Sequence, residues 1–574
     1  MNMKADKIIY GNICTVDKKQ SRAEALAIAD GKFVYVGDEG GAKTFKGEDT
    51  EELRYEGGII LPGLGEGHGH VTPGGIEALF QARLYEGTTL EEYRAIIREQ
   101  IEKHPDHDVI QGTGFQMIPD FEPNGPTADM LEGLTDKPIC IADAGHHSYW
   151  VNHAGMERLG INKDTPDVSD GIVVRDDKGN PTGWFREGAM DIVKPLTPYS
   201  VEQYKEAILY YQEEYLANGE TLFFDPILNN DGTDNATEAY HQLDVEGKLH
   251  MHAFGGYQVF QAAGHDPIAE IGYAAKLRER TRGKMFDLSN IKIQVDGVTE
   301  GNPATAYMKE PYTGPASQKD HNRGQLRFDP DTLTAVFKRA HELGFTVHVH
   351  AIGDGALTMT LDAMEEALAQ TGPHDFRDAI THLQVVDPKD IPRMAKLKVV
   401  ASTDPHWFDM DDDYFAQMAA TLGEERAEAQ MPMKSFFDAG VVVTSASDYA
   451  VTNPAYPLIA VQKGVTRHVI GHPDTVHNPA ERVTVGQMIE AATLNEAYQF
   501  LCDDRLGSIT AGKEADLVVL GMDITACDPD HIHEAPVLAT MVGGDWVYTH
   551  EDARYNDTNA KSLNGSTLSS IIPR

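Results

Sequence analysis

Residues 344–354 constrain the fold of this chain more than any other segment. They alternate polar and apolar side chains over the length of one strand, and helix-like segments at residues 331–343 and 356–368 lie on either side. A strand between two helices is typical of a parallel sheet with helical crossovers, which buries both strand faces. His348 and His350 share one face, and two buried imidazoles need partners. We expect His350, at the strand's end, to bind a metal ion with support from His348; the alternative is a core histidine that only forms a hydrogen bond.

Three further fragments place side chains that can bind a metal where a strand ends. His68 and His70 follow an apolar run, and residues two apart in a strand point to the same side. His382 ends a shorter strand, and Asp448 closes a longer apolar one. Each fragment alone has a plainer explanation, because a His-x-His motif arises by chance and a carboxylate after a strand is often a helix cap. Together they suggest one metal site.

Lys292 lies in the middle of a predicted strand, on the same face as Asp296. A buried lysine is costly unless its ammonium is paired or loses its charge. A neutral amine can take up carbon dioxide to form a carbamate, and that carboxylate can bridge two cations. The alternative is a lysine whose ammonium pairs with Asp296 or reaches solvent.

The order of these fragments resembles the amidohydrolase superfamily, and within it the branch that contains N-substituted formamide deformylases. The resemblance runs from about residue 5 to about residue 548. It is carried by Pro62-Gly63 leading into His68-Gly69-His70, Ile291-Lys292 to Asp296-Gly297, His350-Ala351-Ile352-Gly353-Asp354, Thr381-His382, Ser447-Asp448, His147-Ser148-Tyr149-Trp150-Val151-Asn152 and Gly512-Lys513-Glu514-Ala515-Asp516-Leu517.

This resemblance implies an α/β fold, a (β/α)8 TIM-like barrel with a small β-sandwich domain built from both chain termini. The alternation of strand and helix patterns independently favours a parallel barrel with active residues at the C-terminal strand ends. We expect the β-sandwich domain to comprise residues 1–57 and 505–574 and the metal-dependent hydrolase barrel to comprise residues 58–504. An insertion at about 110–200, in the first half of the barrel, is expected to help wall the pocket.

The resemblance also implies two divalent metal ions and a hydroxide bridging them that attacks a carbon–nitrogen bond of a small molecule. The six expected ligands are His68, His70, carbamylated Lys292, His350, His382 and Asp448. Imidazole and carboxylate ligands suit zinc best, with manganese, cobalt or iron as alternatives. Asp448 would also be catalytic, because one carboxylate can take a proton from the attacking water and pass it to the leaving nitrogen.

Residues on the substrate side are suggested by the same motifs. His147 is the second catalytic candidate, as a group that polarises or binds the substrate by resemblance to the family. Glu187 is a candidate substrate or metal contact, although pairing with Arg186 or a helix cap explains it equally well. Aromatic side chains near the motifs would suit a planar or apolar substrate, and the alternative is plain core packing. These aromatic candidates are Phe115, Trp150, Trp184, Trp407 and Tyr449.

Two other functions stay open from the sequence. One is a single-metal deaminase or other carbon–nitrogen hydrolase, in which Lys292 is only an uncharged neighbour of the site. The other is a non-catalytic scaffold, although such proteins usually lose ligands and all six positions are filled here. Three positions depart from the family pattern without removing a ligand: Glu66 replaces a common aspartate, Gly355 an arginine, and Asp404 a glutamine. Because of these differences, the substrates of the family's other members do not carry over directly to this chain.

Composition limits the remaining functions. A formal net charge of −41 argues against partners such as nucleic acid or anionic membranes. Four cysteines without a CxxC spacing argue against a disulfide framework. Neither an apolar leader nor an uninterrupted apolar stretch of membrane-spanning length is recognisable. We therefore expect a cytoplasmic enzyme acting on a small molecule, with a homodimer as one option for its assembly.

Overall fold

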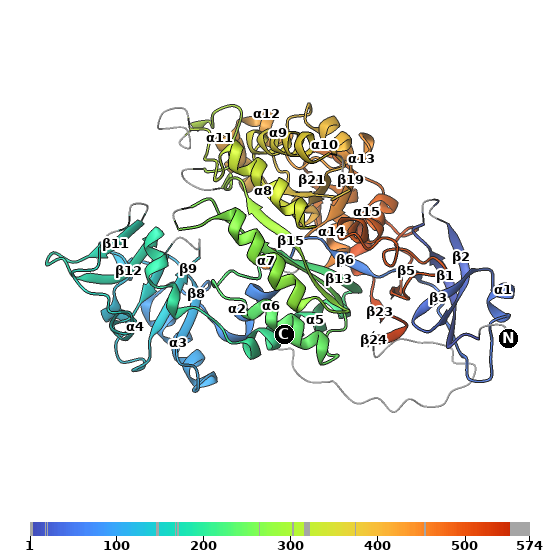
Figure 1. Cartoon of the computed structure of the whole chain (residues 1–574), viewed down its shortest axis with the longest axis horizontal. Coiled ribbons are helices and arrows are strands. Elements are labelled where there is room, and N and C mark those ends of the chain that lie inside the picture. Colours follow the sequence, from blue (N-terminus) through green and yellow to red (C-terminus); the bar gives the residue numbers. More distant parts are fainter. Residues whose placement is uncertain are drawn as a thin grey trace.

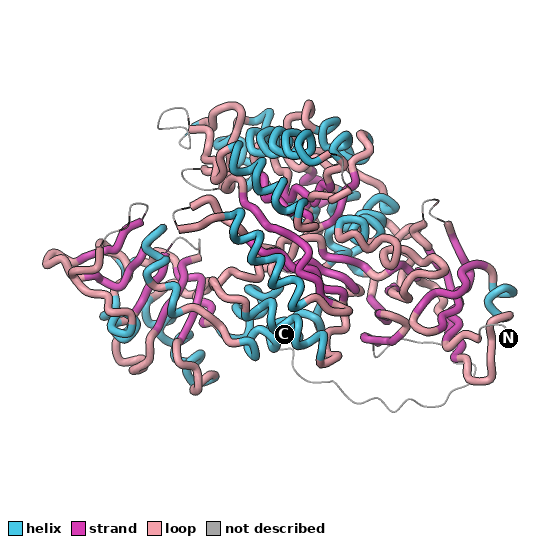
Figure 2. The backbone as a smooth tube through the Cα atoms, viewed as in Figure 1, coloured by secondary structure: helices cyan, strands magenta, loops and turns pink. Residues whose placement is uncertain are grey.

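A computed structural model of the protein describes residues 4–550, apart from 18, 20, 145–147, 167, 169–170, 263, 301–303, 315–321, 373–374 and 453–454. Its three large sheets follow one another along the long axis of the molecule (Figure 1). The barrel lies in the middle, with the sheet made of terminal strands at one end and the insertion at the other. Figure 2 shows helices packed along the outside of the central strands. None of the described helices has both the length and the apolar character needed to cross a membrane.

The central sheet has eight parallel strands in the order β19-β18-β17-β16-β15-β14-β13-β6. The strands are β6 (Leu64–Glu66), β13 (Glu220–Asp225), β14 (His252–Gln258), β15 (Phe286–Gln294), β16 (Thr346–Ala351), β17 (Ala379–His382), β18 (Val400–Thr403) and β19 (Val442–Ser445). The amide of Gly67 donates to the Ser445 carbonyl over 3.2 Å, so the first and last strands meet beyond the end of β6. The predicted (β/α)8 barrel is confirmed.

Helices surround the barrel and begin where the sequence supplies caps. Asp329 accepts the amide of Thr332 and Pro330 occupies the first position of α8, a combination that satisfies or removes donors without a helical partner. The strand expected within residues 344–354 is β16, and all six of its residues are buried. The helices are α2 (Val71–Phe80), α5 (Val201–Ala217), α6 (Asn235–Val245), α7 (Pro267–Thr281), α8 (Pro330–Glu342), α9 (Asp354–Thr371), α10 (Ile391–Leu397), α11 (Asp412–Leu422), α12 (Glu424–Glu428), α13 (Lys434–Asp438), α14 (Pro457–Thr466), α15 (Val485–Ala491) and α16 (Leu494–Gln499). A small hairpin, β20 (His468–Val469) and β21 (His472–Val476), follows α14.

Strands from both chain ends form the second sheet, as the sequence predicts. They are β1 (Lys7–Cys14), β2 (Arg22–Ala29), β3 (Lys32–Gly37), β4 (Glu51–Arg54), β5 (Ile59–Pro62), β22 (Leu517–Leu520), β23 (Val537–Val542) and β24 (Asp545–Thr549), with helix α1 (Glu39–Lys43) after β3. β5 pairs antiparallel with β22, and this pairing joins the two ends of the chain. Apolar side chains from β1 to β5, β22 and β23 meet in one cluster, so the strands enclose a core of their own.

The insertion lies between α2 and α5 and has its own sheet of six strands. They are β7 (Ala82–Arg83), β8 (Ile110–Phe115), β9 (Ile139–Asp143), β10 (Ser148–Val151), β11 (Gly171–Arg175) and β12 (Pro181–Glu187), with helices α3 (Leu90–Lys103) and α4 (His153–Arg158). The expected span of about 110–200 covers β8 to β12, while β7 and α3 precede it. Two apolar clusters lie within this unit, so its packing depends mainly on its own residues.

Candidate metal centre

The candidate ligands gather at the C-terminal ends of the barrel strands, where the chemistry of such barrels is carried. His68 and His70 follow β6, Lys292 lies near the end of β15, and His382 is the last residue of β17. Two of the candidates have a backbone that L-residues rarely adopt, with φ of 75° at His382 and 53° at Asp448. Backbone strain of this kind is often stored at functional sites, because the surrounding fold must hold it in place.

His68, His70 and Asp448 form the tightest group. The Oδ1 atom of Asp448 lies 3.4 Å from Nε2 of His68 and 3.2 Å from Nε2 of His70. This Oδ1 atom is buried and has no hydrogen-bond partner among the described residues. Ligands about 2.0–2.2 Å from a zinc ion stand about 3.3 Å apart in a tetrahedron, so the three atoms have the spacing of ligands to a shared cation. The three donor atoms therefore fit a metal ion.

Glu66 joins the two loops that carry this group. Its Oε1 accepts the backbone amides of His68 over 2.8 Å and of Ser447 over 3.0 Å, and the amide of Asp448 donates to the carbonyl of His68 over 2.9 Å. Burial raises the pKa of the Glu66 carboxyl to about 8, against these amide hydrogen bonds, which lower it. Glu66 thus positions His68 through its backbone amide.

The other ring nitrogen of His68 is held by His348. Nδ1 of His68 and Nε2 of His348 are 2.8 Å apart, and both side chains are buried. Metal-binding histidines usually use their second nitrogen in such a contact, which fixes the ring and its tautomer. Burial, followed by the charge of Lys292, holds the pKa of both imidazoles well below the ordinary value, so both are neutral and able to bind a cation. His348 thus contacts His68 rather than His350, and its supporting role at a metal site stays a prediction.

His350 and His382 complete the ring of imidazoles, with ring centroids 4.5 Å apart. Nδ1 of His382 lies 2.8 Å from Oδ2 of Asp404, and both residues are buried. This contact leaves Nε2 of His382 for a ligand. Nε2 of His350 lies 3.0 Å from the carbonyl oxygen of Gly297 and 3.7 Å from Oδ1 of Asp296. The Nε2 atom of His350 therefore lies close to two oxygens, the Gly297 carbonyl oxygen and Oδ1 of Asp296.

Lys292 is buried, at 2% exposed surface. Burial lowers the pKa of its amine to about 7, against the charges of Asp448 and Asp404, which raise it. The sequence left open a pairing with Asp296, but the Asp296 carboxylate accepts the backbone amides of Tyr307, Ile352 and Gly353 over 2.8 to 3.1 Å. Asp296 thus holds the loop after β16 and is engaged away from Lys292.

Trp407 and Tyr449 are the two aromatic candidates that lie at the site. The Trp407 ring stacks on the His382 ring at 5.4 Å between centroids and 9° between planes, and its Nε1 donates to Oγ1 of Thr452 over 2.8 Å. Tyr449 follows Asp448, and its carbonyl accepts the amide of His70. The Trp407 ring is partly exposed, so it can present one face to a substrate.

The remaining substrate-side candidates are not brought to this group in the described structure. Phe115 and Trp150 are 2% and 0% exposed and pack against Phe121 in the core of the insertion, where their apolar rings are most stable. Glu187 is an exposed residue at the end of β12. His147 lies outside the described residues.

The sequence alone did not point to Tyr307, which lies in the loop after β15. A Cβ atom at Gly355 would lie 2.7 Å from the Tyr307 ring, and one at Gly353 would lie 2.2 Å from its carbonyl oxygen. Gly355, which departs from the family's arginine, therefore makes room for this loop. The Gly353-Asp354-Gly355 pattern is the sequence signal that could have indicated that another part of the backbone packs closely against this segment.

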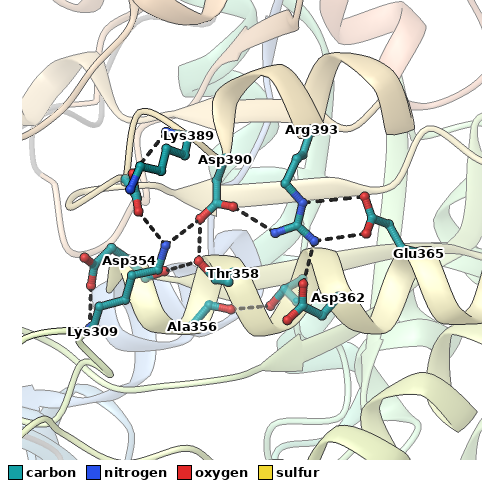
Figure 3. A network of polar contacts seen from close by, with 11 residues as sticks. Lys309, Asp354, Ala356, Thr358, Asp362, Glu365, Lys389, Asp390 and Arg393 are labelled. Carbon is teal, nitrogen blue, oxygen red and sulfur yellow. Dashed lines mark hydrogen bonds and ion pairs between the residues drawn. The ribbon is translucent and has the colours of Figure 1, made fainter.

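Ion pairs hold the same loop to the outside of the barrel (Figure 3). The backbone amide of Lys309 donates to Asp354 over 2.8 Å. Its ammonium lies 2.7 Å from an Asp387 oxygen and 3.0 Å from an Asp390 oxygen. Arg393, on α10, extends the network to α9, and it pairs with Asp390 over 2.8 Å. The loop after β15 is thereby tied to two helices beside the site.

Comparisons with known proteins agree with this architecture. The amidohydrolase family model matches residues 56–548. The protein YtcJ of Bacillus subtilis is 28% identical over 548 residues, covering 94% of this chain and 98% of that protein. The N-substituted formamide deformylase of Arthrobacter pascens is 25% identical over 554 residues, covering 94% and 97%. A metal-dependent hydrolase of Pyrococcus furiosus has a similar fold, with a TM-score of 0.71, 24% identity and coverage of 90% and 99%.

The match to the family model extends over most of the chain and includes every strand of the barrel. The resemblance seen in the sequence motifs is confirmed. This chain belongs to the amidohydrolase family of metal-dependent hydrolases.

Proposed function

We propose that this protein hydrolyses an amide-type carbon–nitrogen bond in a small molecule, with divalent cations held at the candidate metal centre. The observation that carries the proposal is the unpartnered Oδ1 of Asp448, within 3.4 Å of both His68 and His70. Hydrolysis needs a nucleophile, a polarised carbonyl and a proton for the leaving nitrogen. Bound cations supply the first two, because they acidify water and act as Lewis acids.

The residues fit zinc best, since the donors are neutral imidazoles and a carboxylate. His68, His70 and Asp448 would hold one ion. His350 and His382 would hold a second, with Lys292 as a carbamate between them. The lowered pKa of Lys292, about 7, supports the carbamate because the neutral amine is the form that reacts with carbon dioxide.

Asp448 would move the proton during the reaction. Burial would raise the pKa of its carboxyl, but the neighbouring His68 and His70 imidazoles hold it well below the usual value. The carboxylate is thus ionised at neutral pH and can accept a proton from water before delivering it to the leaving nitrogen. We assign His147 to substrate binding, by its resemblance to the family motif.

The exposed face of Trp407 favours a substrate with a planar or apolar part. N-formyl, N-acyl and cyclic amides are the candidate classes, and we rank N-formyl compounds first because of the similarity to an N-substituted formamide deformylase. A panel of these amides assayed with zinc-loaded protein tests the proposal. We expect chelation to abolish hydrolysis and zinc, manganese or cobalt to restore it. Full activity in metal-free protein would overturn the mechanism.

One observation favours a second candidate, a single-metal hydrolase or deaminase. The imidazoles of His350 and His382 already have oxygen partners in Gly297 and Asp404, whereas His68 and His70 face the unpartnered Asp448. Metal analysis of the purified protein, with the ions located by anomalous diffraction, separates the two: two ions at the candidate metal centre are expected for the first candidate and one for the second. The matched variants His70→Ala and His153→Ala, the latter on the exposed surface, show whether any loss is specific to the site.

A further inference from the structure

A second group of metal-binding side chains lies at the opposite end of the barrel. His252 is the first residue of β14, whereas the candidate metal centre lies at the C-terminal strand ends. Glu514 and Asp516 come from the segment just before β22, in the sheet of terminal strands. His252, Glu514 and Asp516 place one donor atom each within 4.8 Å of the other two. The group therefore spans the junction between barrel and terminal sheet.

The spacing of these atoms matches that of ligands to one cation. Nε2 of His252 lies 3.0 Å from Oδ2 of Asp516 and 3.6 Å from Oε2 of Glu514. Tetrahedral zinc ligands stand about 3.3 Å apart, between these two values. His68, His70 and Asp448 show the corresponding separations of 3.4 and 3.2 Å. The two groups thus have similar donor spacings, although they lie on unrelated elements.

Hydrogen bonding does not account for the contact between His252 and Asp516. The two side chains are 2% and 5% exposed. Neither Nε2 of His252 nor Oδ2 of Asp516 has a hydrogen-bond partner in the part of the chain that the structure describes, despite their 3.0 Å separation. Buried polar atoms of this kind are costly, and their presence calls for an explanation such as an ion.

The other oxygens of the two carboxylates are already occupied. Oδ1 of Asp516 accepts the amide of Gly543 over 2.7 Å, and Oε1 of Glu514 accepts from Arg505 over 2.5 Å. These contacts fix both carboxylates so that the remaining oxygens face His252. Glu514 is partly exposed and already pairs with Arg505, so the negative charge without a cationic partner among the described residues is that of the buried Asp516 carboxylate beside the His252 imidazole. A cation bound between the three side chains would balance this charge and give the two unpartnered atoms a common partner.

We propose that His252, Glu514 and Asp516 form a second cation site, of zinc-type chemistry, that is separate from the candidate metal centre. Three protein ligands leave a position for water in a tetrahedral site. The ion would connect a barrel strand to the terminal sheet and stabilise the folded protein, because a ligand that binds only the folded state raises its stability. This proposal does not depend on the reaction at the other site.

Metal analysis of zinc-loaded full-length protein tests the site. His252→Gln and Asp516→Asn should each lower the zinc content by one ion per chain. His250→Gln is the matched control, since His250 is exposed and lies two residues away, and it should keep the wild-type content. The thermal midpoint should rise with zinc in the control but rise less in His252→Gln. Unchanged zinc content in both site variants would overturn the proposal.

Crystals of the wild-type protein give a second test that does not rely on the folding of a variant. Data collected at the zinc absorption edge should show an anomalous peak between His252, Glu514 and Asp516. Peaks confined to the centre around His68 and Asp448 would overturn the second site. They would leave the proposed hydrolase function untouched, so the two ideas fail separately.

Discussion

Asp448 and Lys292 lie in the same buried site, and the pKa of each is lowered for a different reason. The His68 and His70 imidazoles hold the pKa of the Asp448 carboxyl well below its ordinary value, although burial alone would raise it. For Lys292, burial itself lowers the pKa of the amine to about 7. The first effect keeps a base ionised, and the second makes a neutral amine available near neutral pH. Each leads to a prediction about one residue.

Asp448→Asn keeps the side chain's shape but removes its ability to accept a proton. We expect turnover to fall by roughly 10²-fold to 10⁴-fold, as is typical when a general base is lost. The thermal midpoint should change little by comparison. Steady-state kinetics and thermal unfolding measure both. Near-normal turnover would reduce Asp448 to a residue that only closes the strand.

Carbamylation of Lys292 should make metal loading depend on carbon dioxide. The neutral amine becomes more abundant as pH rises through about 7, so zinc uptake by stripped protein should gain more from bicarbonate above that pH than below it. Lys292→Ala should bind less metal and lose the bicarbonate effect, with partial rescue by a short carboxylic acid. Equal metal uptake with and without bicarbonate, at every pH, would exclude the carbamate.

At the scale of elements, the loop after β15 is held close to the start of α9. Tyr307 packs where the side chain of residue 355 would extend, and its amide donates to Asp296 over 2.8 Å. Ion pairs of Lys309 with Asp387 and Asp390 fix the outer part of the loop. The position of the loop after β15 thus depends on a glycine in a helix.

Gly355→Ala tests this contact, because the two relevant effects have opposite signs. Alanine in an open helical position would stabilise the protein by up to about 1 kcal/mol relative to glycine. A Cβ atom 2.7 Å from the Tyr307 ring should instead destabilise it by about 1–3 kcal/mol. Denaturant unfolding gives the sign. Combining it with Tyr307→Ala should recover part of the loss, and additive effects would show that the two residues are not coupled.

Glu66 tests how two loops are joined at the metal centre. Its raised pKa, about 8, means that much of the carboxyl is protonated at neutral pH, and a neutral amide can also accept backbone hydrogen bonds through oxygen. Glu66→Gln should therefore retain metal content, whereas Glu66→Ala leaves two buried amides unsatisfied and should lower stability by about 1–3 kcal/mol. Metal loss in Glu66→Gln would show that the negative charge itself is required.

At the scale of the whole molecule, the barrel holds the six expected ligands of the metal centre, and the insertion packs on itself. Its apolar clusters contain residues of the insertion alone, and Phe115 and Trp150 belong to them. The terminal sheet, in contrast, is joined to the barrel through Gly63, whose amide donates to the carbonyl of Asp516 over 3.2 Å. We therefore expect the metal centre to depend on the barrel and its junction with the terminal sheet, and less on the insertion.

Replacing residues 84–196 by a short flexible linker should leave the metal centre intact. We expect the shortened protein to bind the same number of ions per chain as the full chain, while activity toward amides decreases because substrate contacts such as His147 are lost. Metal analysis and kinetics on the same preparation measure the two outcomes. Loss of a metal ion from a folded, shortened protein would mean that the insertion supplies a ligand.

Local properties of the sequence determined the kind of fold and several candidates. The polar–apolar alternation of β16 and the helix patterns beside it predicted a parallel sheet, because periodicity depends only on neighbouring residues. His350 and His382 could be placed at strand ends for the same reason. The motifs, through family resemblance, also indicated a barrel and a domain shared by both termini. How the metal centre's residues function is still a prediction.

Only the tertiary structure decided which distant side chains meet. Closing the barrel brings Asp448 beside His68, 380 positions earlier in the chain, and no local pattern contains that distance. The same reason applies to Tyr307 at Gly355 and to His252 beside Asp516, since each contact joins separate elements. Burial decided the rest: it placed the Trp150 ring in the core of the insertion rather than at the site, because the sequence shows that a side chain is apolar but not which core it joins.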